Sequence, residues 1–344
     1  MGTVPHGSQQ NAVASPTAIP VPTLADVYAA RQAIAPYLRP TPLLHNAALS
    51  EYLGFDLFLK CENLQPIGAF KVRGGLNLMR SLDPAYREAG VVTASTGNHG
   101  QSIAYAAREF GVRATIYMPE AANPLKVASM QRLGAEVVFA GKDFDEARLR
   151  SIEDAERTGR YYVHTVNEPA IIAGVATCTL EILETIPQLD VLIVPVGGGS
   201  GVSGSLVAGK AINPDLRVVA VQAAGAPAVH DSWRERTLHA YDSVSTFAEG
   251  LATRSSFAYP LEIMWERLDD FVLVEDAMMQ RAMLALLETS RIVAEGAGAA
   301  ATAAAMNLRA EFAGKSVCCV VSGGNVPLAG LRDLLAQGDG QWRG

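Results

Sequence analysis

"VLIVPVGGGSGVSG", residues 191–204, is the stretch that sets the fold class of this 344-residue chain. Its apolar start, without polar alternation, is typical of a strand buried on both faces of a sheet. The glycine-rich run that follows opens a helical pattern, so strand, turn and helix succeed one another directly. Further apolar runs predict strands at 56–60, 91–95, 114–118, 136–140, 217–222 and 316–321.

Helical patterns separate these strands along the chain. Strands that alternate with helices favour an α/β fold, in which helices cover both faces of parallel sheets. The predicted helices lie at 101–110, 124–133, 143–158, 169–186 and 276–292, and an Ala-rich buried helix is expected at 296–308.

Composition narrows the class of protein. With 49% hydrophobic and 18% charged residues, the chain has the make-up of an ordinary globular protein. Its net charge of −7 argues against a nucleic-acid partner, because phosphate binding needs a basic face. The apolar stretch 296–308 is too short to span a bilayer, and residues 1–22 lack the features of a signal peptide. We expect a cytoplasmic protein with a flexible N-terminal arm at 1–22 and no membrane partner.

Metal sites find little support in the sequence. The four cysteines form no CxxC pair, and the six histidines show no HExxH or similar ligand spacing. We therefore predict no metal site.

Three polar, glycine-rich turns follow predicted strands: "STGNHGQ" at 95–101, "GGGSG" at 197–201 and "SGGN" at 322–325. Ligands of open α/β sheets bind outside the carboxyl ends of the strands, so the three turns predict one shared pocket. Consecutive glycines at a helix start let backbone N–H groups converge on an anion. The turn 197–201 therefore predicts a phosphate site, with a merely tight strand–helix turn as the alternative.

Lys71 lies in the short stretch "GAFKVRGG", residues 68–75. A lysine in such a loop is usually a solvated surface residue. Beside a phosphate cradle, however, it fits pyridoxal 5'-phosphate, which binds a lysine as a Schiff base and carries a phosphate, a ring nitrogen and a ring oxygen. Lys71 and the three turns could supply these four partners.

These motifs, in this order, resemble the serine/threonine dehydratase family of fold-type-II pyridoxal-phosphate enzymes. That family includes threonine ammonia-lyases, serine racemases and hydroxyectoine-pathway dehydratases. The resemblance runs from about residue 23 to about residue 335 and includes "RPTPL" (39–43), "NEPAIIAGVAT" (167–177) and "VAEGAGA" (293–299).

The resemblance implies a tryptophan synthase β-like structure with two open, mostly parallel sheets. Residues 23–89 and 168–344 would form a large cofactor-binding domain, and residues 90–167 a small domain that carries the substrate loop. Relatives are commonly homodimers, which is the expected state here.

The resemblance also assigns roles to single residues. Lys71 would form the Schiff base and then remove the Cα proton of the substrate, with the aromatic Phe70 beside it. Asn98 would hydrogen-bond the ring oxygen, and Ser322 would face the ring nitrogen. The phosphate would be held by Gly197, Gly198, Gly199, Ser200 and Gly201, and the substrate carboxylate by Ser95, Thr96, Asn98 and His99.

Two further residues match family positions less specifically. Glu295 aligns with an acidic residue near the cofactor, but a glutamate at a helix start is equally well a dipole partner. Arg148 aligns with an arginine near the substrate, but it lies in a charged helix that is typical of a solvated face.

The predicted reaction is the dehydration and deamination of a β-hydroxy-α-amino acid to a 2-oxo acid and ammonia. The substrate would be the small molecule L-threonine or L-serine, or a bulkier 3-hydroxy amino acid. Serine racemase is an alternative, although racemases place a serine where Thr96 stands. A β-replacement enzyme of the cysteine synthase type is another. Gln222 replaces a glutamate that often binds a cation in the family, so we expect little dependence on magnesium or calcium.

Overall fold

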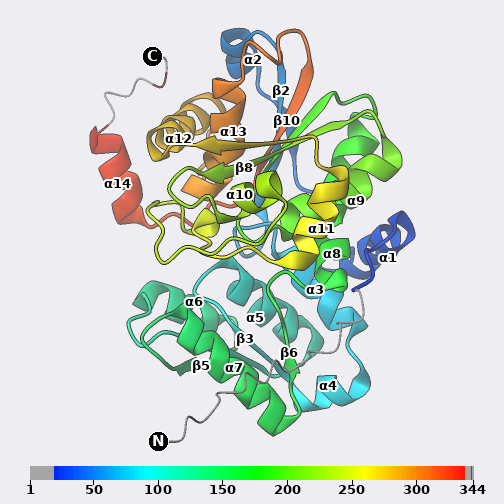
Figure 1. The fold of residues 1–344 in the computed structure, drawn as a ribbon, viewed down its shortest axis with the longest axis vertical. Helices are drawn as coiled ribbons and strands as arrows, with labels where there is room; N and C mark the ends of the chain where they lie inside the picture. Colours follow the sequence, from blue (N-terminus) through cyan, green and yellow to red (C-terminus); the bar gives the residue numbers. More distant parts are fainter. Residues whose placement is uncertain (1–18, 338–341, 343–344) are drawn as a thin grey trace, which may run out of the picture.

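The computed structural model describes residues 19–337 and 342, and its strands form two separate sheets (Figure 1). In the larger sheet every neighbouring pair is parallel except the antiparallel pair β1–β2 at one edge. Its strand order is β1 (Leu43–His45), β2 (Asp56–Cys61), β10 (Ser316–Val321), β7 (Val191–Pro195), β8 (Arg217–Ala223) and β9 (Asp270–Val274).

The smaller sheet is entirely parallel. Its strand order is β5 (Glu136–Phe139), β4 (Ala114–Met118), β3 (Val91–Ala94) and β6 (Tyr161–Tyr162). In Figure 1 the elements of this sheet lie below those of the larger one. The prediction of an α/β fold with two mostly parallel sheets is confirmed.

Each of the seven strands predicted from apolar runs is present, within one residue at either end. Three strands were not predicted. Strands β1 and β6 have three and two residues, too few to show a pattern. Strand β9 reads "DFVLV", with three of its five residues half-buried. Its four consecutive apolar residues match the pattern of the predicted strands, so it could have been predicted in the same way.

Helices cover the two sheets and connect their strands (Figure 1). They are α1 (Leu24–Ile34), α2 (Ala47–Leu53), α3 (Val72–Ser81), α4 (Pro84–Ala89), α5 (Asn98–Phe110), α6 (Pro124–Arg132), α7 (Phe144–Thr158), α8 (Pro169–Thr185), α9 (Ser200–Ile212), α10 (Ala228–Glu235), α11 (Ala258–Arg267), α12 (Asp276–Ser290), α13 (Gly296–Asn307) and α14 (Leu328–Gln337), with short 3-10 helices η1 (Glu62–Leu64) and η2 (Glu249–Leu251).

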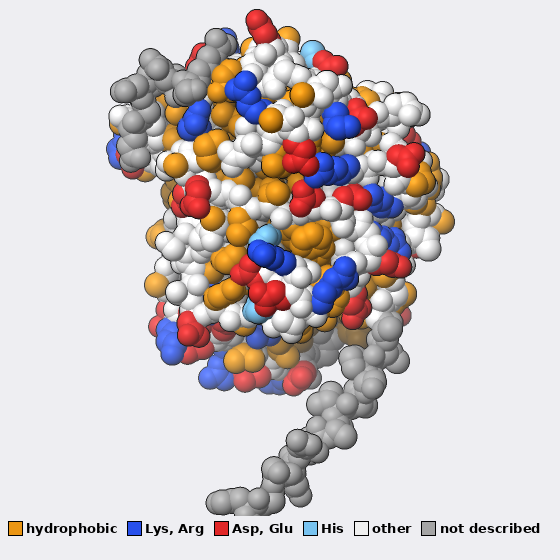
Figure 2. Space-filling view, turned by 45° about the horizontal axis from the view of Figure 1, so that its top comes forward, with side chains coloured by type: hydrophobic (Ala, Val, Ile, Leu, Met, Phe, Trp, Pro, Cys, Tyr) orange, Lys and Arg blue, Asp and Glu red, His pale blue; other side chains and the backbone are white. Residues whose placement is uncertain are grey.

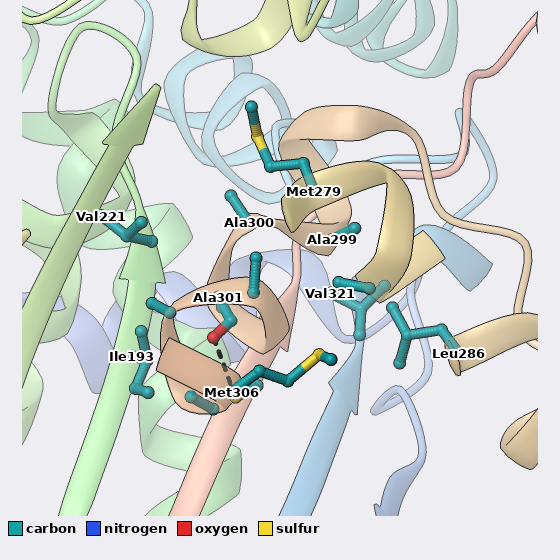
Figure 3. Close-up of a cluster of buried hydrophobic side chains, with 14 of the residues drawn as sticks. Ile193, Val221, Met279, Leu286, Ala299, Ala300, Ala301, Met306 and Val321 are labelled. Atoms are coloured by element: carbon teal, nitrogen blue, oxygen red, sulfur yellow. Dashed lines mark hydrogen bonds between the residues drawn. The ribbon is translucent and has the colours of Figure 1, made fainter. Parts of the chain in front are cut away.

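Helix α13 is the predicted Ala-rich helix, and residues 296–306 of it are buried. Small side chains let the helix pack close to the larger sheet, where Ala300 joins Ile193 and Val321 in one apolar cluster. Figure 3 shows this cluster together with Met279 and Leu286 of α12, the helix that packs on α13. The core therefore runs from the sheet through α13 to α12.

Glycines bring α3 very close to its neighbour α8. A Cβ atom on Gly174 of α8 would lie 2.5 Å from the Arg73 carbonyl oxygen and 2.8 Å from the Gly74 Cα of α3. Real Cβ atoms do not approach backbone atoms this closely, so the contact requires glycine. Because Lys71 immediately precedes α3, this packing also fixes where the lysine starts.

The described residues show neither a membrane-spanning helix nor a cluster of metal ligands. Among residues 19–337 and 342, no helix is long and apolar enough to cross a bilayer, and no three His, Cys, Asp or Glu side chains gather as metal ligands. Of the predicted N-terminal arm, residues 1–18 lie outside the described part, and Pro20 accepts a 2.7 Å hydrogen bond from the Tyr259 hydroxyl. On the face drawn in Figure 2, basic and acidic side chains are interspersed.

We predict that Gly174→Ala destabilises the protein by about 2 kcal/mol, because the added methyl group overpacks the α3–α8 contact. The control is Gly209→Ala in α9, where the nearest atom to an added Cβ is the Leu216 Cδ2, 3.0 Å away. That methyl group can give way, and alanine raises helix propensity, so stability should stay within about 1 kcal/mol. Urea unfolding measures both. Equal stability of Gly174→Ala and the wild type would show that the two helices can separate freely.

Candidate active site

Lys71 caps the N-terminus of α3, and its partly buried amine points at the start of α9. The Lys71 Nζ donates a hydrogen bond to the Ser200 Oγ at 2.8 Å. Its ammonium lies 5.4 Å from the ring centroid of Phe70. Within the described residues no carboxylate forms an ion pair with it. Burial lowers the pKa of Lys71 to about 8, so a larger share of this amine than of an ordinary lysine is deprotonated and able to react near neutral pH.

The glycine turn after β7 wraps closely around the start of α9. Gly199 has φ +106°, a left-handed conformation that favours glycine. A Cβ on Gly197 would strike the Gly250 carbonyl oxygen, and a Cβ on Gly198 would lie 2.7 Å from the Val166 side chain. The first-turn N–H groups of α9 have no partner within the helix, so the bare backbone forms a cradle suited to a phosphate.

Ser322 follows β10 and ties the turn 322–325 to the lysine loop. Its side chain is buried and donates to the Ala297 carbonyl oxygen at 3.3 Å. Its own carbonyl oxygen accepts the Phe70 N–H at 3.0 Å. Phe70, in turn, lies 3.2 Å from the position of a Cβ on Gly201. Phe70, Gly201 and Ser322, three of the predicted cofactor contacts, thus line one small cavity. Its other lining residues are Val175, Cys178, Val194, Pro195, Ser205 and Val320.

Asn98 begins α5 and reaches across to the turn 322–325. Its Nδ2 donates to the Glu295 Oε1 at 2.8 Å, and its Oδ1 accepts from the Asn325 Nδ2 at 2.8 Å. Burial raises the pKa of Glu295, and the Asn98 hydrogen bond opposes this. The structure therefore brings Glu295 next to Asn98. Asn325 was overlooked in the sequence, although it ends the "SGGN" motif.

The substrate-loop residues Ser95 and His99 shape the turn from inside. The Ser95 Oγ accepts the N–H groups of Gly97 at 3.2 Å and Gly100 at 2.9 Å. His99 is buried and lies 3.2 Å from the Thr93 hydroxyl. Burial, with smaller effects of nearby charges, lowers the pKa of His99 to about 3, so its ring is neutral at physiological pH. Thr96 is partly buried at the tip.

Arg148 lies on α7, away from these contacts. It is partly exposed, and its Nε lies 3.9 Å from the Asp145 Oδ1. Burial lowers the pKa of His164 to about 4, and the charge of Arg148 adds to this effect. No hydrogen bond or ion pair of the described structure joins Arg148 to Lys71 or Asn98.

Segment 246–257 forms one wall beside the glycine turn. A Cβ on Gly197 would lie 3.6 Å from the Thr253 Oγ1. The segment also reaches the smaller sheet's helices, because Glu249 pairs with Lys126 of α6 and Arg254 pairs with Asp145 of α7. The cradle is therefore bounded by a segment that contacts both halves of the molecule.

Comparisons with known proteins agree with this geometry. A family model described as pyridoxal-phosphate dependent enzyme matches residues 34–323. An L-threonine ammonia-lyase of Thermotoga maritima is 39% identical over 92% of this chain and 79% of its own length. The structure of maize serine racemase matches with a TM-score of 0.87 and 32% identity, over 92% of this chain and 97% of that one. The structure of the processed form of threonine deaminase isoform 2 from Solanum lycopersicum matches with a TM-score of 0.87 and 30% identity. The match covers 91% of this chain and 86% of that one.

The chain belongs to the family of pyridoxal-phosphate dependent enzymes. The predicted cofactor, the resemblance to serine/threonine dehydratases and the ammonia-lyase type of enzyme are confirmed. The site fits the cofactor: a buried amine that contacts Ser200 faces a backbone cradle whose glycines leave room for an anion.

The lowered pKa of Lys71 leads to a pH prediction for protein stripped of its cofactor. At pH 8 about half of this amine is deprotonated, whereas an ordinary lysine is almost wholly charged. The rate at which added pyridoxal phosphate forms an imine with Lys71 should therefore rise with pH and level off above about 8. Borohydride reduction followed by mass spectrometry measures it. Lys210, which is ion-paired with Asp269 near the surface, serves as the control. A rate at Lys71 that keeps climbing toward pH 10 would contradict the lowered pKa.

A second prediction concerns metal removal. Gln222 is fully buried, and its Oε1 accepts the His230 N–H of α10 at 3.0 Å. This amide offers a cation no carboxylate. We expect that a chelator leaves the turnover rate within about twofold, because no strong ligand for a hard cation stands here. Loss of most activity in chelator, restored by magnesium or calcium, would contradict this.

Proposed function

We propose that this ammonia-lyase dehydrates and deaminates L-threonine, L-serine or a bulkier 3-hydroxy amino acid to a 2-oxo acid and ammonia. The observation that carries the proposal is the desolvated amine of Lys71, held 2.8 Å from Ser200 at the start of the glycine turn. The similarity to a threonine ammonia-lyase and a threonine deaminase supports the choice of reaction.

Each residue has a proposed task. Lys71 would hold the cofactor, and its amine, when free, would take the proton from the substrate Cα. The N–H groups of Gly197–Gly201 hold the phosphate, and Asn98 orients the ring through its oxygen. When bound, the cofactor supplies an electron sink for the charge that develops at Cα.

Ser322 favours elimination over other outcomes. It is a buried, neutral hydroxyl, so it would give the ring nitrogen of a bound cofactor no counter-charge. The sink is then weak, which disfavours a long-lived negative charge at Cα. Early loss of a hydroxyl group from Cβ is the reaction that this environment favours.

The substrate carboxylate would meet the turn 95–99. Because the pKa of His99 is lowered to about 3, this ring contributes no positive charge. Since Ser95 already accepts two backbone N–H groups, its hydroxyl proton is free to point at an anion. Thr96 at the tip and the first N–H groups of α5 would complete the contact.

Serine racemase is the second candidate, favoured by the structural similarity to the maize enzyme. Against it stands Thr96, whose methyl group restricts the hydroxyl rotamer on the cofactor face where racemases use serine. Cysteine synthases, which catalyse β-replacement, share the fold, but their substrate is acetylated serine.

Other parts of the proposal concern the whole molecule. The strands of the smaller sheet all fall between residues 91 and 162, which supports a small domain at 90–167 that closes over the substrate. A homodimer and a cytoplasmic location remain predictions from the resemblance and the composition.

The proposed function predicts that L-serine and L-threonine yield 2-oxo acid and ammonia, and that Lys71→Ala loses at least about 10³-fold in kcat. Lys210→Ala, a lysine change on α9, is the control and should keep wild-type activity. A coupled dehydrogenase assay measures the 2-oxo acid, and chiral chromatography measures D-serine. If L-serine gave mainly D-serine, the racemase reading would replace this one. Turnover of acetylated serine alone would favour β-replacement.

A further inference from the structure

Four charged side chains are buried together behind the lysine loop. Lys60, Glu62 and Arg73 are 1%, 0% and 0% exposed, and the side chain of Glu181 is 11% exposed. Buried charges are costly unless each is paired and hydrogen-bonded. Here two cations meet two carboxylates, so the group is electrically balanced.

Arg73 uses all five of its N–H donors within this group. Its Nε and Nη2 donate to the two carboxylate oxygens of Glu62 at 2.7 and 2.8 Å. Its Nη1 and Nη2 donate to the two oxygens of Glu181 at 2.6 and 2.8 Å. The remaining Nη1 donor reaches the Thr177 hydroxyl at 3.0 Å. The planar guanidinium is thus fixed in position and in orientation.

The other members close the group. Lys60 donates to Glu181 at 2.6 Å and to the Thr41 carbonyl oxygen at 2.8 Å, and the Thr41 hydroxyl donates to Glu62 at 2.5 Å. Burial by itself would raise the pKa of Glu62, but the charge and hydrogen bonds of Arg73 outweigh it and hold this pKa below its usual range. Both partners of the Glu62–Arg73 pair are therefore ionised at neutral pH.

The Glu62–Arg73 pair joins the two ends of the loop that carries Lys71. Glu62 begins η1 directly after β2, and Arg73 lies in the first turn of α3. Between them, Phe70 and Lys71 are held by the Ser322 carbonyl oxygen and by the Ser102 hydroxyl, which donates to the Lys71 carbonyl oxygen at 2.6 Å. Glu181 anchors the same guanidinium to α8.

Stability alone does not require charges at these positions. Replacing a buried ion group with packed apolar side chains is often neutral or stabilising. The five hydrogen bonds of the Arg73 guanidinium add something else, because they fix one backbone geometry on either side of this residue. That geometry is the starting point of the Lys71 side chain, two residues away.

We propose that Arg73, held by Glu62 and Glu181, is a positioning residue that sets where the Lys71 amine lies relative to Ser200 and the glycine turn. The inference rests on the proposed function in one respect, which is that Lys71 carries the cofactor.

The test compares Arg73→Lys with Arg31→Lys in purified holoenzyme. Lysine keeps the charge but loses the five-bond fork. Arg31 of α1 pairs with Glu184, which lies on α8 as Glu181 does. The Arg31 and Glu184 side chains are 40% and 46% exposed, so the control makes the same change in a solvated pair. Borohydride reduction and mass spectrometry give the fraction of Lys71 that carries cofactor. The visible absorbance, the Tm, and kcat and KM per trapped cofactor complete the measurement.

We expect Arg73→Lys to remain folded, to carry less trapped cofactor on Lys71, and to lose about 100-fold in kcat per trapped cofactor, because a shift of about 1 Å in a reacting group costs that much. KM should change little, and Arg31→Lys should match the wild type. A folded Arg73→Lys protein with no trapped cofactor would equally support the proposal.

A wild-type kcat per trapped cofactor and a wild-type trapped fraction in Arg73→Lys would overturn the proposal, whatever the change in Tm, because the network would then act on stability alone. If Arg73→Lys does not fold, Glu181→Gln decides, with Glu184→Gln as its control. Glu181→Gln keeps the side-chain volume and removes one charge. We expect the same loss of trapped cofactor and of kcat as for Arg73→Lys. If wild-type protein forms no trapped adduct on Lys71, the proposed function falls and this inference with it. Normal trapping in the wild type confines a failure to the positioning role.

Discussion

A partly buried lysine that forms no ion pair with any residue of 19–337 or 342 is the constraint on which the site depends. Burial lowers the pKa of Lys71 to about 8, and its amine donates a hydrogen bond to the Ser200 hydroxyl. Such an amine is reactive because the protein does not stabilise its charge. It must therefore be held by its backbone, through α3, the Phe70 contact with Ser322 and the Ser102 contact with Lys71 itself.

The side chains of His99 and Ser322 add no charge to the pocket of the Lys71 amine. The ring of His99 is neutral because its pKa is lowered to about 3, and Ser322 offers a hydroxyl where an acid could stand. The fixed charges of Lys60, Glu62, Arg73 and Glu181 balance one another and lie behind the loop. Positive charge within the pocket would then come from backbone N–H groups, which bind a phosphate without competing for the proton of Lys71.

The fold and the identity of the cofactor were largely predictable because they rest on local patterns. Apolar runs located the central strands, and the order of the glycine turns pointed to one shared pocket. The partners of the charged residues were not predictable. Glu181 lies 108 residues from Arg73, so no spacing in the sequence links them, and a charged residue in a motif gives no sign that it is buried. For Asn325 a signal existed, since the "SGGN" motif that supplied Ser322 also contains it.

The contacts divide into a set that an opening motion would break and a set that it would leave intact. Lys126 with Glu249 and Arg254 with Asp145 join the smaller sheet's helices to segment 246–257, and in each pair at least one partner is exposed. Exposed pairs contribute little to stability, so parting them costs little. The Asn98 bonds to Glu295 and Asn325 also cross this boundary, whereas the Arg73 network joins β2, α3 and α8 and includes no residue between 91 and 162. The proposed opening for substrate would thus part Asn98 from Glu295 and Asn325 and leave the Arg73 network unbroken. The Ser102 bond to the Lys71 carbonyl oxygen also comes from α5, so this contact ties the lysine loop to the helix that carries Asn98.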